Sequence, residues 1–454
     1  MSNYEKSPTI DCGNESHASG STILEPCRPP QTGAPSNPPG NIIQSNSADE
    51  KSKGPPNGGL VAWTQVLCGF MLFFNTFGLL TSFGVFQTYY ESEAIFNHSS
   101  SDISWIGSVQ AFLVQFCGLI SGPVYDRGYL RSLLCAGCFL LVFGHMMLSL
   151  ANTYWQIILS QGICIGIGMG CLYVPSISIL PSYFSTRLGL AIGVASSGSS
   201  LGGVIYPIVM HRLLENIGFP WAVRVMGFIA LATMTIPISL MRIRLKPAKA
   251  RALIDPAAFT DWPYIWFTVA TMIGFMGITA FQFYFSFYAK ANKLTSSDLA
   301  FDLVPIYNAV SAIGRIVPNA ISDKTGLFNI LAPGVLLTGV VYYCSMAVHE
   351  KGPMIGVTIL GGFFLGLLTA LPPVCFAALV KDKSKIGTRI GMGTATIAFG
   401  LLVGGPGAGG ILRGQEPLNW SGLWSFAGTA MVISGIMYVL LRIHRSGFKL
   451  LVKA

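Results

Sequence analysis

The chain has 454 residues, of which 52% are hydrophobic and 10% are charged, and its formal net charge is +9. A soluble globular chain carries about a quarter charged residues, so this composition excludes a protein whose main solvent is water. The Lys and Arg residues are not gathered in one basic segment with interleaved aromatics, so the charge does not predict nucleic-acid binding. Long apolar runs recur from Val61 onward, which predicts one large integral membrane domain.

Residues 1–56 are rich in Ser, Pro, Asn and Gly and contain few aromatics. Such a segment cannot bury enough apolar surface to offset the entropy of the chain, so we predict a disordered cytoplasmic tail. It has no apolar stretch after a basic start, which predicts that there is no cleavable signal peptide. The first membrane helix is then expected to serve as the targeting signal.

Twelve apolar spans follow, each about the 20 residues that cross a bilayer as a helix. They lie near 61–89, 104–125, 130–150, 154–181, 187–210, 219–241, 263–289, 300–321, 328–348, 353–380, 387–412 and 421–442. A basic segment separates the first six spans from the last six. We therefore predict an all-α membrane protein with an N-terminal six-helix half at 57–241, a cytoplasmic linker at 242–262, a C-terminal six-helix half at 263–442 and a cytoplasmic tail at 443–454.

The Lys and Arg residues concentrate in alternate loops, which is a signal of topology. Because cytoplasmic loops carry the excess of basic residues, we predict that both termini and the linker are cytoplasmic, with the plasma membrane as the expected location. Two glycosylation sequons, at Asn97 and Asn419, would then face outward, close to the membrane.

Similar charged loops follow the second and the eighth spans. Asp126, Arg127 and Gly128 end the first loop, and Asp323, Lys324 and a glycine occupy the corresponding places in the second. We predict that these charges bond helix ends across the boundary between the halves and hold the outward-open state. The alternative is that they are ordinary charges of short cytoplasmic loops.

Twelve helices, a basic central linker and this repeated loop resemble the major facilitator superfamily. Two further stretches, 57–63 (NGGLVAW) and 183–198 (YFSTRLGLAIGVASSG), resemble the two signatures of its monocarboxylate porter family and are most similar to fungal members. Asn57 stands where the family usually has an acid. The resemblance implies two six-helix halves around a central site and transport by alternating access.

Arg315, deep in the eighth span, is the first candidate for substrate binding. A charged side chain in mid-membrane marks a functional site by default, and a guanidinium can grip a carboxylate through two parallel hydrogen bonds. A structural arginine bonded to carbonyls and hydroxyls is the alternative. Asn308 and Ser311 precede Arg315 by seven and four residues, which places all three on one face of the helix.

The resemblance implies a substrate-binding role for Arg315, but two of the family's residues are absent. Its usual acid, one turn before this arginine, is replaced by Ser311, and its usual lysine in the first helix is replaced by Thr81. Proton coupling through that pair therefore does not carry over. The two replacements favour export of a larger metabolite over uptake of a small carboxylate.

Further polar residues within the spans, Asn75, Thr81 and Gln282, are candidates for hydrogen-bonding a solute in a central cavity. The alternative for each is a hydrogen bond to a neighbouring helix. The aromatic run 281–288 is expected to pack mainly against lipid and other helices, with one or two rings facing the cavity.

We predict a secondary active transporter of a small organic solute, an organic acid or a secondary metabolite, with export favoured. Uptake of monocarboxylates with protons is the alternative, and a solute receptor or a membrane enzyme is a remote one. The sequence has no phosphate-binding loop for ATP, so a gradient, of protons for example, is the expected energy source. The six histidines are dispersed, and we predict no cofactor and no metal site. The expected partners are the solute and the lipid bilayer.

Overall fold

The computed structural model describes residues 55–92, 98–244, 250–380, 382, 385–412 and 418–447, without the side chains of 319, 320, 323 and 324. The helices belong to one compact unit, residues 53–454. Nearly all of the predicted tail at 1–56 lies outside the described residues, and so does Asn97.

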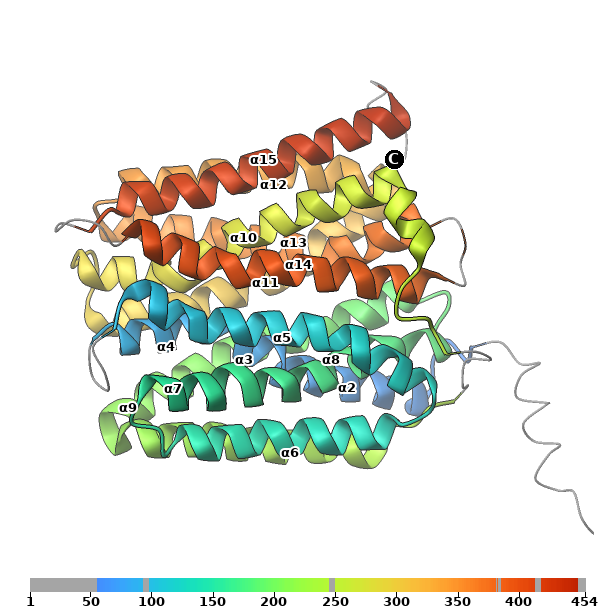
Figure 1. The fold of residues 1–454 in the computed structure, drawn as a ribbon, viewed down its shortest axis with the longest axis horizontal. Helices are drawn as coiled ribbons and strands as arrows, with labels where there is room; N and C mark the ends of the chain where they lie inside the picture. The colour runs from blue at the N-terminus through green and yellow to red at the C-terminus, as the bar shows by residue number, and fades with distance from the viewer. Residues whose placement is uncertain are drawn as a thin grey trace, which may run out of the picture. The chain divides into compact units, whose positions relative to one another are not determined.

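The elements up to residue 240, here called the N-terminal helices, run side by side with the elements from residue 262 onward, the C-terminal helices (Figure 1). The N-terminal helices are α2 (Leu60–Asn75), α3 (Phe77–Thr81), α4 (Phe83–Tyr90), α5 (Ser100–Asp126), α6 (Leu130–Leu148), α7 (Tyr154–Ile157), the π-helix η1 (Ile158–Ile165), α8 (Gly166–Ser178), the short η2 (Leu180–Ser182) and α9 (Leu188–Leu240). After η3 (Pro256–Thr260), the C-terminal helices are α10 (Trp262–Ala291), α11 (Ser297–Thr325), α12 (Leu327–Cys344), η4 (Ser345–Ala347), α13 (Lys351–Leu379), α14 (Ile386–Leu412) and α15 (Trp420–Ser446).

Eleven helical stretches among the described residues are long and apolar enough to cross a membrane. One of them, α9, has 53 residues. As a single helix it would be about 80 Å long, against a hydrocarbon core of about 30 Å. Its backbone leaves the helical region at Gly218 (φ 74°, ψ 169°), two residues before Pro220. α9 is therefore two membrane helices, and the predicted all-α, twelve-helix fold is confirmed.

The first membrane helix is interrupted twice. At Thr76 the backbone turns to φ −99° and ψ −85°, and the Thr76 hydroxyl donates to the Leu72 carbonyl at 2.8 Å. At Ser82 a second hydroxyl donates to the Gly78 carbonyl at 2.7 Å. Because such side chains offer helical carbonyls an alternative donor, they loosen the regular ladder. The predicted span 61–89 is thus built from three short helices.

Glycines allow close packing of one helix pair within the N-terminal helices and of the corresponding pair within the C-terminal helices. Gly198 and Gly202 of α9 lie against α2, and Gly400 and Gly404 of α14 lie against α10. A Cβ at any of the four positions would collide with backbone carbonyls of the neighbouring helix. Small residues at four-residue spacing let membrane helices pack closely. The same close packing therefore recurs between the first and fifth membrane helices of each set.

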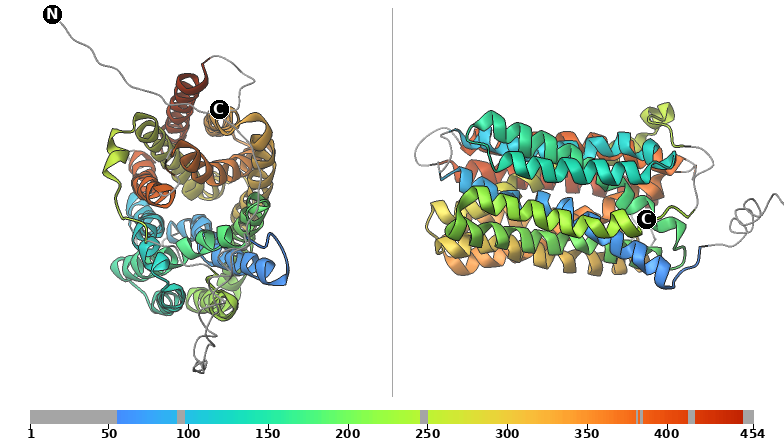
Figure 2. Two further views of the ribbon diagram at one scale, coloured as in Figure 1. Left: turned by 90° about the vertical axis from the view of Figure 1, so that its right-hand side faces the viewer. Right: turned by 90° about the horizontal axis from the view of Figure 1, so that it is seen from below.

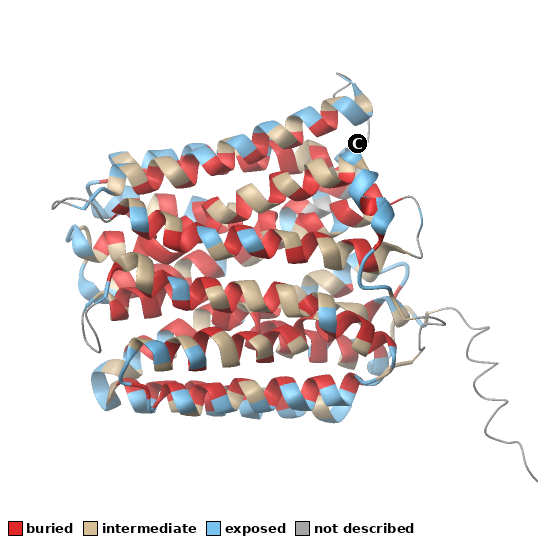
Figure 3. Cartoon of the chain, in the orientation of Figure 1, coloured by how far each residue is buried: buried red, intermediate tan, exposed pale blue. Residues whose placement is uncertain are grey.

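The bundle has two ends. The end at which α5 finishes, α14 begins and the segment 250–261 lies is called the linker end here, and it is on the right in Figure 1. The opposite end, where α5 begins and α14 finishes, is called the far end. The left view of Figure 2 shows the helices end-on from the linker end. Figure 3 shows buried positions facing neighbouring helices while exposed positions lie outside. Large apolar side chains such as Phe228 and Leu337 are exposed there, as lipid contact requires.

Candidate functional site

The N- and C-terminal helices meet halfway along α11 in a polar contact. There the hydroxyls of Ser200 on α9 and Ser311 on α11 are 3.0 Å apart and share a hydrogen bond. Ser311 also donates to the carbonyl of Asn308 at 2.7 Å. This contact between α3, α9 and α11 is called the central seam, and its residues are Thr81, Ser200, Gly203, Asn308 and Ser311.

Asn308 has an unused acceptor at the central seam. Its Nδ2 donates to the Val304 carbonyl at 3.0 Å, whereas its buried Oδ1 accepts no hydrogen bond. A Cβ on Gly203 would lie 2.5 Å from Asn308 Cγ and 2.6 Å from Thr81 Oγ1, so the glycine lets these two side chains lie side by side. A buried acceptor without a donor costs about 1–3 kcal/mol. A hydroxyl or amide of a solute would satisfy it.

Arg315 follows Ser311 by one turn toward the linker end, and 5% of its surface is exposed. α13 packs tightly here, because a Cβ on Gly366 would lie 2.7 Å from the Arg315 backbone nitrogen. By helical periodicity, Arg315 shares the face of α11 that carries Asn308 and Ser311. The polar side chains of the central seam are therefore followed, toward the linker end, by the buried guanidinium of Arg315.

Two other predicted residues lie apart from the seam. Asn75 is fully buried among the N-terminal helices, where its Nδ2 donates to Thr233 at 2.9 Å and its Oδ1 accepts from the Tyr206 hydroxyl at 2.7 Å. Its amide is thus used to join helices. Gln282 is buried on α10 beside α4. A Cβ on Gly84 of α4 would lie 2.9 Å from the Gln282 carbonyl oxygen.

The two stretches that resemble porter signatures touch each other at the linker end. Asn57 Oδ1 accepts from the backbone N–H of Ser185 at 2.6 Å and of Thr186 at 2.9 Å. The ring of Trp63 packs edge-on against Phe184, with centroids 5.5 Å apart. The amide oxygen of Asn57 therefore joins the start of the first membrane helix to the segment before the fifth.

The far end is closed by contacts between N- and C-terminal helices. Thr88 on α4 donates to Ser286 on α10 at 3.2 Å, and Ser101 on α5 donates to the Pro406 carbonyl on α14 at 3.0 Å. The Tyr284 hydroxyl adds a hydrogen bond to a carbonyl at the start of α5, at 2.9 Å. These bonds hold the two sets of helices together on that side.

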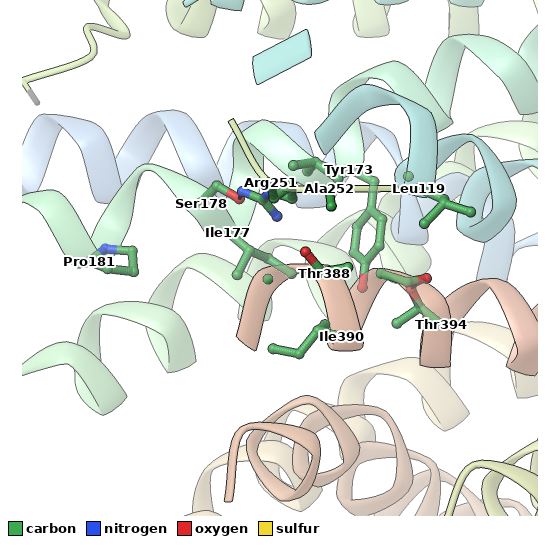
Figure 4. Close-up of a pocket in the computed structure, with 14 residues that line it drawn as sticks. Leu119, Tyr173, Ile177, Ser178, Pro181, Arg251, Ala252, Thr388, Ile390 and Thr394 are labelled. Atoms are coloured by element: carbon green, nitrogen blue, oxygen red, sulfur yellow. Dashed lines mark hydrogen bonds between the residues drawn. The ribbon is translucent and has the colours of Figure 1, made fainter. Parts of the chain in front are cut away.

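A cavity of about 260 Å³ opens at the linker end, between α5 and α8 on one side and α14 on the other (Figure 4). The Tyr173 ring points across it toward the part of α14 that carries Thr388 and Thr394, and Arg251 covers one side. Its lining is completed by Gly118, Leu119, Val174, Ile177, Ser178, Pro181, Ala252, Gly387, Ile390 and Gly391. The six predicted substrate-binding residues do not line it. This cavity was not predicted, because tyrosine and threonine in apolar spans carry little sequence signal.

Asp126, the acid of the first charged loop, is bonded to the segment between the two sets of helices. Its carboxylate accepts hydrogen bonds from the backbone nitrogen, Nε and Nη2 of Arg251 at 2.9, 2.7 and 2.9 Å. Arg127 is exposed to solvent. The side chains of Asp323 and Lys324 lie outside the described part of the structure. The observed partner of Asp126 is thus Arg251 rather than the end of a helix, and the predicted latch stays a prediction.

A second ion-pair group holds the start of α14 to the same segment. Asp255 accepts from Arg389 at 2.9 Å and from Lys385 at 3.1 Å, and Arg389 also donates to Asp261 at 2.5 Å. Hydrogen bonds from Arg389 and Lys385 hold the pKa of the Asp255 carboxyl below its ordinary value. In the sequence these charges are signals of topology, and their pairing was not predicted.

Comparisons with known proteins agree with this architecture. Residues 66–351 match the model of the Major Facilitator Superfamily. The MFS-type transporter dbaD of Emericella nidulans is 52% identical over 93% of this chain and 94% of the relative. The aspyridones efflux protein apdF of the same organism is 36% identical over 87% of this chain and 80% of the relative.

Two solved structures share the fold. The nucleoside transporter NupG has a TM-score of 0.67 at 12% identity and covers 84% of this chain and 99% of its own. The peptide transporter POT has a TM-score of 0.69 at 14% identity and covers 89% of this chain and 99% of its own. The protein is therefore a multi-pass membrane transporter and not an enzyme, and the chain belongs to the Major Facilitator Superfamily.

Proposed function

We propose that this transporter exports an organic acid or a secondary metabolite by alternating access, with the central seam and Arg315 as its substrate site. The observation that carries the proposal is the buried, unpaired Asn308 Oδ1 beside Thr81. It lies where the N- and C-terminal helices meet, on the helix face that continues to Arg315. An acceptor left without a donor between two moving parts is what a solute hydroxyl or amide would complete.

The charge of the site suggests the class of solute. Arg315 offers a planar group with several donors, which suits a carboxylate, an enolate or another anionic oxygen. Asn308, Thr81 and Ser311 offer neutral hydrogen-bonding groups. A metabolite with one acidic group and further hydroxyl or carbonyl groups would use both.

The arrangement of the two ends supports alternating access. Hydrogen bonds between the N- and C-terminal helices close the far end, and the cavity beside Tyr173 lies at the linker end. In the proposed topology the linker end is cytoplasmic, because the basic residues of the chain concentrate in the loops on that side. The conformation is then inward-facing, ready to receive a solute from the cytoplasm.

Export is supported by two observations. One relative is named as an efflux protein for aspyridones. The acid and lysine that serve proton-linked uptake in monocarboxylate porters are replaced here by Ser311 and Thr81, both at the central seam. We propose the plasma membrane as its location, with both termini cytoplasmic and a proton or solute gradient as the energy source.

Membership of the monocarboxylate porter family is part of the proposal. The direct contacts of Asn57 with Ser185 and Thr186 support it, because they join the two segments on which the resemblance rests. Uptake of a monocarboxylate with protons is the second candidate function, which Arg315 favours and the replaced acid and lysine disfavour.

Transport by purified protein in liposomes tests the proposal. The intact chain, Arg315→Ala and Arg224→Ala are compared with labelled small monocarboxylates and with larger acidic metabolites, with and without a pH gradient. Arg224 is the matched control because it is a second arginine within a membrane helix, bonded to Ser149 at 3.0 Å and placed against Trp221.

We expect transport of the larger metabolites, a large loss in Arg315→Ala and little change in Arg224→Ala. If only small monocarboxylates are transported, and only with a pH gradient, the result would contradict export and support the uptake function. Equal activity of the two arginine variants would remove Arg315 from the site.

A further inference from the structure

Three side chains that can ligate a metal meet at the far end, away from the central seam. His211 and Glu215 lie four residues apart on α9, so they share one helix face. Asp298 belongs to the first turn of α11. One ligating atom from each of the three residues lies within 4.8 Å of the other two. Sequence analysis predicted no such group, because Asp298 is distant along the chain.

The histidine of this group is buried and has an unused nitrogen. The side chain of His211 is 5% exposed, and its ring is stacked on Phe301 with centroids 4.5 Å apart. Its Nε2 is buried and makes no hydrogen bond. The nearest carboxylate oxygen, Asp298 Oδ1, is 3.6 Å away, which is too far for a hydrogen bond. The stacked ring thus places an unsatisfied nitrogen 3.6 Å from the Asp298 carboxylate, and a ligand atom of Glu215 completes the group.

The distance between His211 Nε2 and Asp298 Oδ1 fits two ligands of one metal ion better than it fits a direct hydrogen bond. Two ligands of a tetrahedral Zn²⁺ with bonds of about 2.1 Å are about 3.4 Å apart. The observed 3.6 Å between Nε2 and Oδ1 is close to that value. Glu215 is exposed, so its flexible side chain can move by the small distance that a third bond requires. Imidazole with carboxylates favours a transition-metal ion over Ca²⁺ or Mg²⁺, which prefer oxygen ligands.

We propose that His211, Glu215 and Asp298 form a binding site for a divalent transition-metal ion of the Zn²⁺ class. The ion joins α9 of the N-terminal helices to α11 of the C-terminal helices. Because the far end must open in each cycle of alternating access, a bound ion holds the closed state. The site is separate from the central seam and binds the ion whether or not the proposed substrate is correct.

The test is zinc binding to the full chain in detergent, carried on an affinity tag without histidines. Bound zinc is measured by equilibrium dialysis with metal analysis, and the unfolding temperature is followed as ZnCl₂ is added. We expect one zinc ion per chain and a rise in the unfolding temperature, because a ligand that binds only the folded state stabilises it. MgCl₂ and CaCl₂ should have no comparable effect.

Two variants and a control decide the outcome. His211→Ala removes the buried ligand. Asp298→Asn removes an exposed ligand, 64% exposed, so we expect this variant to keep the fold. Each should weaken zinc binding by at least about tenfold. His98→Ala is the matched control, because His98 also lies near a carboxylate, that of Asp102 at 3.8 Å, and is 42% exposed. No bound zinc, or equal zinc binding in Asp298→Asn and the intact chain, would overturn the proposal.

Discussion

Asp126→Asn tests how strongly the segment 250–261 is held to α5. The carboxylate accepts three hydrogen bonds from Arg251, two of them from the guanidinium, and is itself 5% exposed. The substitution removes the negative charge and leaves one acceptor oxygen. Arg251 is then left opposite a neutral amide.

The expected loss can be worked out from this geometry. Removing one partner of a buried pair costs about 3–5 kcal/mol, because the other charge is left uncompensated. Arg251 is 22% exposed and can regain water, which lowers the expected cost. We therefore expect a loss of about 2 kcal/mol, which for a chain of this length lowers the unfolding temperature by roughly 2 °C.

The assay is thermal unfolding of the purified chain in detergent, with Arg127→Gln as the control. Arg127 is the next residue and is exposed, so its loss should leave the unfolding temperature unchanged within about 1 °C. Arg251→Gln should lower it as Asp126→Asn does, and the double variant should add little more, because the two residues form one interaction. Equal unfolding temperatures for Asp126→Asn and Arg127→Gln would refute the reasoning.

Three further predictions concern single side chains. Gly203→Ala should impair folding or transport, because its Cβ would lie 2.5 Å from Asn308 Cγ. Gly193→Ala is the control and should be tolerated, because its Cβ would meet nothing within 4 Å. The unfolding temperature and the transport rate of each variant check both expectations. Burial raises the pKa of Glu91 to about 7, above its value of about 4.5 in the unfolded chain. The unfolded chain therefore loses this proton first, so the free energy of unfolding should fall by up to about 3 kcal/mol as the pH rises from 5 to 7. It should stay low above pH 7. Glu91→Gln should remove this slope, and an unchanged slope in a pH series of unfolding temperatures would contradict the assignment. Tyr307→Phe should change stability by less than about 1 kcal/mol or raise it, because its buried hydroxyl has no partner in good hydrogen-bond geometry and faces the equally unsatisfied hydroxyl of Tyr342. A large loss in denaturant or thermal unfolding would show that the two hydroxyls form a strong hydrogen bond.

The membrane helices could be predicted closely because length and apolarity are strong signals in a bilayer. The predicted span 387–412 corresponds to α14 at Ile386–Leu412. The break in the first helix was not predicted, because Thr76 and Ser82 are ordinary residues in a membrane helix. Only their local hydrogen bonds to carbonyls show the interruption.

The candidate site was predictable in part. Helical periodicity placed Asn308 and Ser311 on one face of the helix. The Ser200–Ser311 hydrogen bond and the position of Gly203 against Asn308 show that this face meets α9. Asn75 gave the same sequence signal, yet its amide is occupied by Tyr206 and Thr233. Whether a polar residue faces a seam or a neighbouring helix depends on the rotation of each helix, which a single sequence does not specify.

A reversible cross-link across the central seam tests the account most directly. The ten native cysteines are replaced, and Ser200→Cys is combined with Ser311→Cys, whose hydroxyls are 3.0 Å apart, within reach of a disulfide. The control pair, Asn75→Cys with Thr233→Cys, replaces a side-chain hydrogen bond of 2.9 Å that joins two N-terminal helices. The account predicts that oxidation of the seam pair stops transport, that reduction restores it, and that the control pair transports in both states. Unchanged transport by a fully cross-linked seam would contradict it.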